Sequence, residues 1–194
     1  MYEVAHLLLF IEINNIIVKM GLGKKYMPTS SAKYKGIGTK KKQGDSGLRP
    51  KPPRWSGQHF PTLVIEAGNS ESLPRLYEDK NLWFNMSPPG EPQGDVKIVL
   101  LVKVYHGNKT KRIVVEQWYR DHQSPYHTVT AKPHPDKPFS IHDVDHWVVE
   151  GAPMVLPFQD VFLRPAQGQE TDLVLTDDFF ATMAMECWET ATDI

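Results

Sequence analysis

The stretch Pro61-Thr62-Leu63-Val64-Ile65-Glu66-Ala67-Gly68-Asn69 decides the fold more than any other part of the chain. Its centre is a run of apolar, mostly β-branched residues, which is typical of a strand buried on both faces. Gly68-Asn69 then favours a turn, and Ser70 or Ser72 can cap a following helix. We therefore expect a central strand over 62–67 that leads directly into a helix.

The segments around this strand predict an α/β (α+β) fold, with a mixed central sheet flanked by helices. Apolar runs at 96–105 and 111–119 predict two strands joined as a hairpin by the Gly107-Asn108 turn. We expect a long loop over 120–140, a final helix capped by Thr176, and several short extended segments, at 32–37, 45–49, 147–149, 154–156, 161–163 and 173–175. Residues 1–120 are assigned to the core, and 121–194 to a C-terminal extension packed on the same domain.

The apolar run near the N-terminus predicts a helix over 4–20, with Leu7, Leu8, Ile11, Asn15 and Val18 on one face. The run is too short and too polar to cross a bilayer, and it lacks the basic start and cleavage site of a signal peptide. The single cysteine, Cys187, excludes an intramolecular disulfide and a Cys-based zinc site. We therefore expect an intracellular protein, nuclear or cytoplasmic, that is neither secreted nor bound to a membrane.

Composition indicates a globular protein, and charge is distributed unevenly along it. The chain has 194 residues, of which 40% are hydrophobic and 23% charged, and this excludes a fully disordered chain, a collagen and a coiled coil. The net charge of -1 combines -2 over residues 1–18, +10 over 19–60 and -9 over 61–194. The basic segment 24–54 contains Lys40, Lys41, Lys42 and Arg49. It either attracts the phosphates of a nucleic acid or is a solvated lysine-rich loop.

Glu66 is the residue most suggestive of chemistry, because it interrupts a strand that is otherwise expected to be buried. A carboxylate in such a place is costly unless it is paired or binds a metal. Asp45 lies on another expected extended segment, and two carboxylates from neighbouring strands would suit Mg²⁺ or Mn²⁺. Such an ion can activate a water molecule for attack on a phosphodiester. The alternative is a buried ion pair between Glu66 and a Lys or Arg.

Two stretches also resemble a group of uncharacterised fungal proteins. Lys42-Gln43-Gly44-Asp45-Ser46-Gly47-Leu48-Arg49-Pro50 is similar to their KEPDAS..P stretch, and residues 61–72 are similar to their WPTLVVEVGYSES stretch. The similarity covers most of the chain from about residue 30. The order of these motifs resembles the PD-(D/E)XK nuclease superfamily, whose known members mostly cut or bind nucleic acid. The resemblance implies a restriction-endonuclease-like core, with Asp45 and Glu66 as metal ligands. In some members an acid on an N-terminal helix, here Glu12, is a third ligand.

Two positions depart from the superfamily pattern. Gly44 replaces the proline before the aspartate, and Gly68 replaces the lysine two residues after the glutamate. The catalytic lysine must then come from elsewhere, or catalysis is lost. Lys97, which opens the next expected strand, is our first choice, and Lys80 on the following helix could also reach. The expected function is a metal-dependent, nuclease-like protein that acts on nucleic-acid phosphodiesters, of DNA rather than RNA, or a catalytically degenerate form of one. The alternative is a non-catalytic module that binds nucleic acid or protein on the same fold.

Two other patterns carry weaker hypotheses. Gly68-Asn69-Ser70-Glu71-Ser72 lies between a strand and a helix, as a hydrolase nucleophile would, but Ser70 is better explained as a helix cap. His142 and His146 have the spacing of a metal-binding pair on a helix, but their Pro-rich surroundings favour a polar loop.

Overall fold

The computed structural model describes residues 1–30, 32–36, 41–69, 73–90, 93–107 and 111–192. Its helices are α1 (Tyr2–Lys19), α2 (Leu73–Met86), the short 3₁₀ helix η2 (Val144–His146), α3 (Phe158–Phe162) and α4 (Asp177–Thr192). Its strands are β1 (Tyr26–Pro28), β2 (Lys33–Lys35), β3 (Lys41–Gln43), β4 (Ser46–Pro50), β5 (Leu63–Asn69), β6 (Ile98–Tyr105), β7 (Arg112–Trp118), β8 (His127–Pro133), β9 (Trp147–Glu150), β10 (Met154–Leu156) and β11 (Leu173–Leu175).

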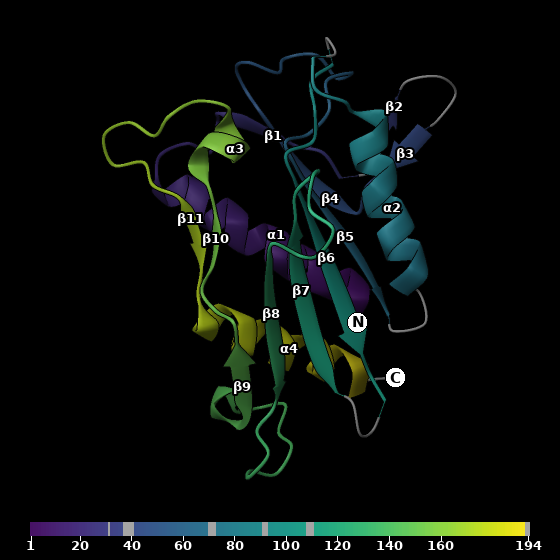
Figure 1. The fold of residues 1–194 in the computed structure, drawn as a ribbon. Helices are drawn as coiled ribbons and strands as arrows, with labels where there is room; N and C mark the ends of the chain where they lie inside the picture. The colour runs from purple at the N-terminus through teal and green to yellow at the C-terminus, as the bar shows by residue number, and fades with distance from the viewer. Residues whose placement is uncertain (31, 37–40, 70–72, 91–92, 108–110, 193–194) are drawn as a thin grey trace.

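A seven-stranded mixed sheet in the order β1-β4-β5-β6-β7-β8-β9 forms the centre of the fold (Figure 1). β5 and β6 run parallel, with Leu63 opposite Ile98, and α2 connects them. The other neighbouring strands of this sheet are antiparallel. The expected α+β fold, with a mixed central sheet flanked by helices, is therefore confirmed.

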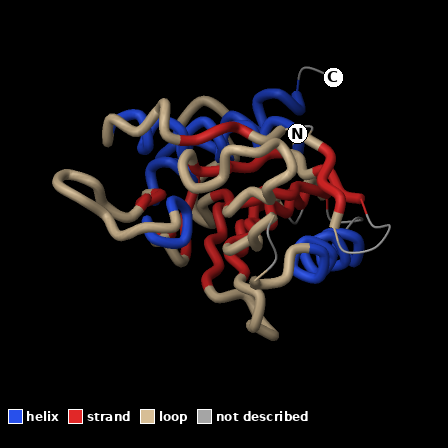
Figure 2. Tube along the Cα trace, turned by 90° about the horizontal axis from the view of Figure 1, so that it is seen from above, coloured by secondary structure: helices blue, strands red, loops and turns tan. Residues whose placement is uncertain are grey.

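The alternation of side chains along β5 separates two hydrophobic clusters. Leu63 and Ile65 belong to the larger cluster, which includes residues of α1 and α4, whereas Val64 belongs to a smaller cluster with residues of α2. The helices accordingly cover opposite faces of the sheet, with α1 and α4 on one and α2 on the other (Figure 2). Because Glu66 follows Val64 by two residues, its side chain lies on the α2 face.

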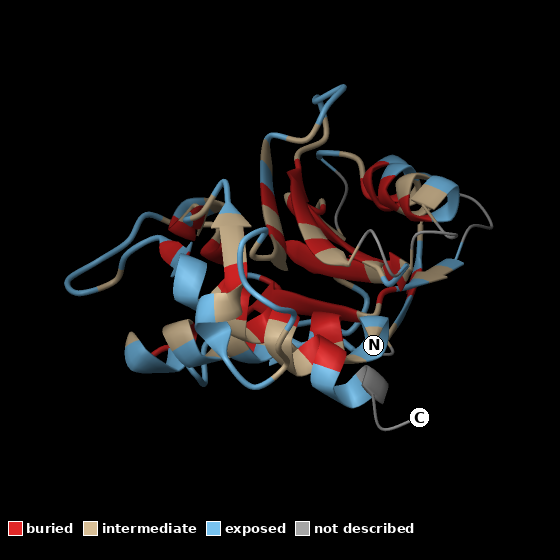
Figure 3. Ribbon diagram, turned by 90° about the horizontal axis from the view of Figure 1, so that it is seen from below, coloured by how far each residue is buried: buried red, intermediate tan, exposed pale blue. Residues whose placement is uncertain are grey.

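The prediction of a helix at the N-terminus is confirmed, but the prediction of its buried face is wrong. Fully buried positions on α1 are Ala5, Leu9, Ile13 and Ile17, whereas Leu7, Ile11 and Val18 are exposed. The helix is apolar on nearly every side, so hydrophobic spacing alone could not select the face that meets the sheet. α2 is more clearly amphipathic, and Figure 3 shows its buried side turned to the sheet and its exposed side turned away.

The region after residue 120 is more regular than its sequence indicates. The expected loop over 120–140 contains β8, which joins the central sheet between β7 and β9, and the expected extended segment at 161–163 overlaps α3. Strands at 154–156 and 173–175 are confirmed as β10 and β11, which pair with each other. The central sheet thus takes strands from both sides of residue 120. Within the described residues, no helix is long and apolar enough to cross a membrane.

Candidate functional site

Asp45 and Glu66 meet where β4 begins beside the middle of β5. β4 and β5 are antiparallel, with Ser46 opposite Ile65, so Asp45 lies one position beyond the paired segment and level with Glu66. His6 of α1 hydrogen-bonds through Nδ1 to Ser46 Oγ at 3.0 Å, which fixes the first turns of α1 beside this point. The structure therefore brings together the two carboxylates that the sequence pairs.

Asp45 compensates for the end of the β4–β5 ladder. No residue of β4 lies opposite Ala67, and the Ala67 N–H donates instead to Asp45 Oδ2 at 2.8 Å. A carboxylate that accepts from a backbone N–H is held in a defined orientation. Asp45 is therefore oriented by the backbone of β5.

Glu66 is buried, with only 3% of its surface exposed, and Trp83 of α2 donates its indole N–H to Glu66 Oε1 at 2.5 Å. A Cβ at Gly44 would lie 3.1 Å from Trp83 Cζ2, so a glycine at this position gives the indole room to reach the carboxylate. Burial raises the pKa of Glu66 to about 7, and the nearby charges of Asp45 and Asp79 act in the same direction. Lys42 and the Trp83 hydrogen bond lower the pKa, but they do not outweigh burial.

Lys42 places its ammonium group between Glu66 and Asp79. Its Nζ lies 3.2 Å from Glu66 Oε1 and 2.7 Å from Asp79 Oδ1 of α2. It reaches them because β3 pairs with β2 in a hairpin, and alternation along β3 turns Lys42 inward while Lys41 and Gln43 are exposed. The alternative explanation for a buried acid at Glu66 was an ion pair with a Lys or Arg. The structure contains such a pair, between Lys42 and Glu66.

These side chains line one open cavity of about 360 Å³. It is bounded by the first turn of α1, by β3 and the start of β4, by the C-terminal half of β5, and by α2. Its lining residues are Tyr2, Lys42, Gln43, Asp45, Glu66, Ala67, Gly68, Asn69, Arg75, Leu76 and Asp79. Gly68 lines the cavity without contributing a side chain, and Lys42 places an ammonium group beside Glu66.

The donor set suits a hard divalent cation that keeps most of its water. Asp45 and Glu66 offer carboxylate oxygens to one cavity, and Mg²⁺ is commonly held by one or two carboxylates and several waters. Within the described ranges, no three His, Cys, Asp or Glu side chains are grouped to hold a metal ion. A cation here would therefore rest on two carboxylates. Glu12, the third ligand that the resemblance implies, is not among the residues of the cavity.

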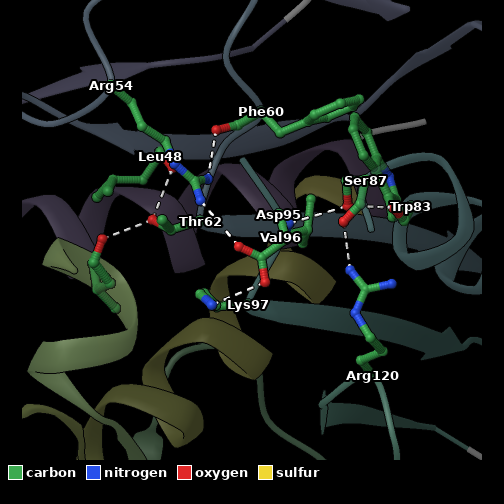
Figure 4. A network of polar contacts seen from close by, with 11 residues as sticks. Leu48, Arg54, Phe60, Thr62, Trp83, Ser87, Asp95, Val96, Lys97 and Arg120 are labelled. Atoms are coloured by element: carbon green, nitrogen blue, oxygen red, sulfur yellow. Dashed lines mark hydrogen bonds and ion pairs between the residues drawn. The ribbon is translucent and has the colours of Figure 1, made fainter. Parts of the chain in front are cut away.

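Lys97 lies away from this cavity. Its Nζ pairs with Asp95 Oδ2 at 2.9 Å, and Asp95 also accepts from Arg54 at 3.3 Å (Figure 4). Glu66 is opposite Leu101 in the β5–β6 ladder, and Lys97 is four residues earlier, which is about 13 Å along the strand. The structure thus does not bring Lys97 together with Asp45 and Glu66.

The residues expected to contact nucleic acid separate into three groups. Lys41 is exposed on the β2–β3 hairpin, as are Lys33 and Lys35 on the paired strand. Lys42 faces the cavity, as described above. Arg49 is only 6% exposed and donates to the His59 carbonyl oxygen at 3.5 Å, so it offers little surface to a phosphate. Lys40 lies outside the described residues.

The weaker hypotheses acquire no supporting geometry. Ser70 lies outside the described residues. His146 Nε2 contacts Asp143 at 3.2 Å, and its Nδ1 is 2.7 Å from the Pro138 carbonyl oxygen, so both ring nitrogens already have partners. The sequence also gave no signal for the roles of Trp83 and Asp79, because α2 must pack on the sheet before either approaches Glu66.

Comparisons with known proteins give a likeness in shape to solved structures but none in sequence. No protein-family model matches the sequence, and no curated protein matches it. Among solved structures, the chain is similar to the one described as "a putative nuclease belonging to DUF820 from Anabaena variabilis ATCC 29413", with 10% identity and a TM-score of 0.48. That match covers 94% of this chain and 81% of the other.

Proposed function

We propose that the protein is a metal-dependent, nuclease-like protein that acts on nucleic-acid phosphodiesters at the Asp45–Glu66 cavity. The observation that carries this proposal is the convergence of Asp45 and Glu66 on one open cavity with Lys42, which a third carboxylate, Asp79, holds beside the buried Glu66. Acidic residues and a cation that converge in this way provide what phosphodiester hydrolysis requires, namely ligands for a divalent ion and positive charge for the transition state.

Each side chain has a role that follows from its contacts. Asp45 and Glu66 would hold Mg²⁺ or Mn²⁺, which when bound lowers the pKa of a coordinated water and offsets phosphate charge. Asp79 holds Lys42 Nζ at 2.7 Å, and Lys42 can donate to a phosphate oxygen from that position. The Trp83 N–H donates to Glu66 Oε1 and fixes the orientation of the carboxylate.

The exposed lysines of the β2–β3 hairpin extend this site toward a nucleic-acid backbone. Lys33, Lys35 and Lys41 are exposed on the same hairpin that supplies Lys42, so they add positive charge beside the cavity. Lysines in such a position contact phosphates and give affinity without sequence preference. The substrate class that fits these contacts is DNA or RNA, and the proposal favours DNA.

A specific observation supports a second candidate function, a non-catalytic module that binds nucleic acid. Lys42 Nζ is 3.2 Å from the Glu66 oxygen that a cation could otherwise share, and Gly68 supplies no lysine of its own. A stable Lys42–Glu66 pair would occupy Glu66 in place of a cation, and the exposed hairpin lysines would still bind phosphates. This candidate predicts salt-sensitive binding without cleavage.

Binding of Mn²⁺ by the purified protein tests the proposal and separates the two candidates. Titration calorimetry should show one Mn²⁺ site in the wild type, and Asp45→Asn should abolish it. Asp121→Asn removes an exposed aspartate that does not line the cavity and should bind Mn²⁺ like the wild type. If the folded wild type binds no Mn²⁺, or if Asp45→Asn binds it normally, the metal-dependent function is wrong.

A further inference from the structure

A second open cavity, of about 550 Å³, lies on the other side of α2 from the Asp45–Glu66 cavity. Successive residues of α2 face the two cavities: Leu76 and Asp79 line the first, whereas Tyr77 and Lys80 line the second. The remaining wall is formed by the end of β7 and the segment that follows it. The full lining consists of Tyr77, Lys80, Asn81, Glu116, Trp118, Arg120, His122, Gln123, Ser124 and Pro125.

The only carboxylate among these lining residues, Glu116, already has its partners. Lys103 donates from Nζ to Glu116 Oε1, Tyr77 donates its hydroxyl to the same oxygen at 3.4 Å, and Trp118 donates its indole N–H to Oε2 at 2.9 Å. The side chains of Lys103 and Glu116 are only 4% and 9% exposed. This buried pair is neutral as a unit, so Glu116 does not make the cavity acidic.

Lys80 is a buried cation that lacks an ion-pair partner in the described part of the chain. Only 8% of the surface of Lys80 is exposed, and its Nζ lies 3.8 Å from the centroid of the Trp118 ring. A ring face stabilises an ammonium group less than a carboxylate would, and burial of an uncompensated charge is costly. Burial accordingly lowers the pKa of Lys80, although the charge of Glu116 acts against this shift.

Arg120 places a second positive charge beside the same cavity. Its guanidinium donates to the carbonyl oxygens of Phe84 and Ser87, the latter at 2.6 Å (Figure 4). These carbonyls lie at the C-terminal end of α2, so the helix fixes Arg120 in place. Among the described residues, no carboxylate forms an ion pair with Arg120. The cavity therefore combines two cations without a matching anion.

We propose that this cavity is a phosphate-binding site with Lys80 as its principal ligand. A phosphate carries up to two negative charges and several acceptor oxygens, so it can accept from Lys80 and from Asn81, His122 or Ser124 at once. Its charge would compensate the two cations that the fold leaves unmatched. The phosphate comes either from the backbone of a nucleic-acid strand or from a free nucleotide. The site does not depend on metal binding or hydrolysis at the Asp45–Glu66 cavity.

Calorimetric titration in EDTA at low ionic strength tests the site without involving the metal. The probes are inorganic phosphate, thymidine 5′-monophosphate and a ten-residue oligothymidylate without a terminal phosphate. For any of these probes that occupies the site, Lys80→Met should weaken binding at least about tenfold, as expected for loss of a hydrogen bond to a charged group. Lys80→Arg, which keeps the charge, should retain most of the affinity.

Lys111→Met is the matched control, because Lys111 also lies over an aromatic ring, with its Nζ 5.1 Å from the Phe139 centroid, but does not line the cavity. It should bind each probe within about twofold of the wild type. Thermal unfolding should show Lys80→Met to be at least as stable as the wild type, since the substitution removes a buried charge; Lys80→Gln repeats the test if the methionine variant does not fold.

If Lys80→Met weakens binding of the oligonucleotide alone, the ligand is a strand phosphate; if it weakens binding of the monophosphate alone, the ligand is a free nucleotide. Either result supports the site. The proposal is overturned if the wild type binds no phosphate probe, if acetate binds as tightly as inorganic phosphate, or if the two methionine variants lose affinity equally.

Discussion

Replacing Glu66 by glutamine should make the stability of the protein less sensitive to pH. Burial raises the pKa of Glu66 to about 7 from an ordinary value of 4.5 in the folded protein. The folded state therefore holds the proton more tightly than the unfolded state. The stabilisation is fully present below pH 4.5 and is lost as the pH rises toward the folded pKa of 7.

The size of this pH effect on stability follows from the pKa values of Glu66 in the unfolded and folded states, 4.5 and about 7. Ionisation of Glu66 costs the folded state about 0.8 kcal/mol at pH 5 and about 3.3 kcal/mol at pH 8, a difference of about 2.5 kcal/mol. Glutamine cannot ionise, and its side-chain oxygen can still accept the Trp83 N–H. The wild type should therefore lose about 2.5 kcal/mol relative to Glu66→Gln between these pH values.

Urea denaturation of both proteins at pH 5 and pH 8, in EDTA to exclude metal, measures this difference directly. Other titrating groups contribute similarly to both proteins and largely cancel in the comparison. A free-energy difference between the two proteins that is the same at both pH values would refute the argument, because it would mean that Glu66 titrates normally in the folded state.

Three further variants test a contact of the site, a contact of the core and the proposed nucleic-acid interface. Trp83→Phe removes the indole donor and should destabilise the protein by about 2 kcal/mol or more at pH 8 and by less at pH 5, as urea denaturation would show; equal losses at both pH values would contradict a hydrogen bond to an ionised group. Thr62→Val removes a hydroxyl that donates to the Val161 carbonyl oxygen at 2.7 Å, with the Leu48 carbonyl oxygen at 3.3 Å as a second, weaker acceptor; it should cost about 1–3 kcal/mol, whereas no change in the urea midpoint would argue against this bond. Replacing Lys33, Lys35 and Lys41 together by glutamine should reduce the steepness of the salt dependence of duplex binding by up to about 2.7 in a plot of log K against log salt concentration, and an unchanged slope would exclude the hairpin from the interface.

Local sequence was sufficient for the centre of the sheet. The strands at β5, β6 and β7 were predicted because apolar, β-branched runs and a Gly-Asn turn each favour the same local structure. The strand β8 was not predicted, because its residues alternate in exposure and the Pro- and His-rich segments beside it resemble a loop. Its conformation depends on pairing with β7 and β9, which the local sequence does not encode.

The candidate site was predicted in part. Glu66 was conspicuous as an acid in a buried strand, and the order of motifs joined it to Asp45. The contribution of Lys42 was missed, because it requires the β2–β3 hairpin to fold against α2 and turn alternate lysines inward. Lys97 was predicted instead because it opens the next strand along the chain. The register of β5 and β6 places Lys97 at the far end of β6 from Glu66, beside Asp95.

The central claim is that the Asp45–Glu66 cavity hydrolyses phosphodiesters with a divalent metal ion. The most direct measurement is cleavage of supercoiled plasmid, single-stranded DNA and RNA in Mn²⁺ by the wild type and by Glu66→Gln, after confirming that both proteins are folded. We predict that the wild type cleaves at least one of these substrates and that Glu66→Gln does not. Absence of cleavage by the folded, Mn²⁺-bound wild type, or equal cleavage by both proteins, would contradict this claim.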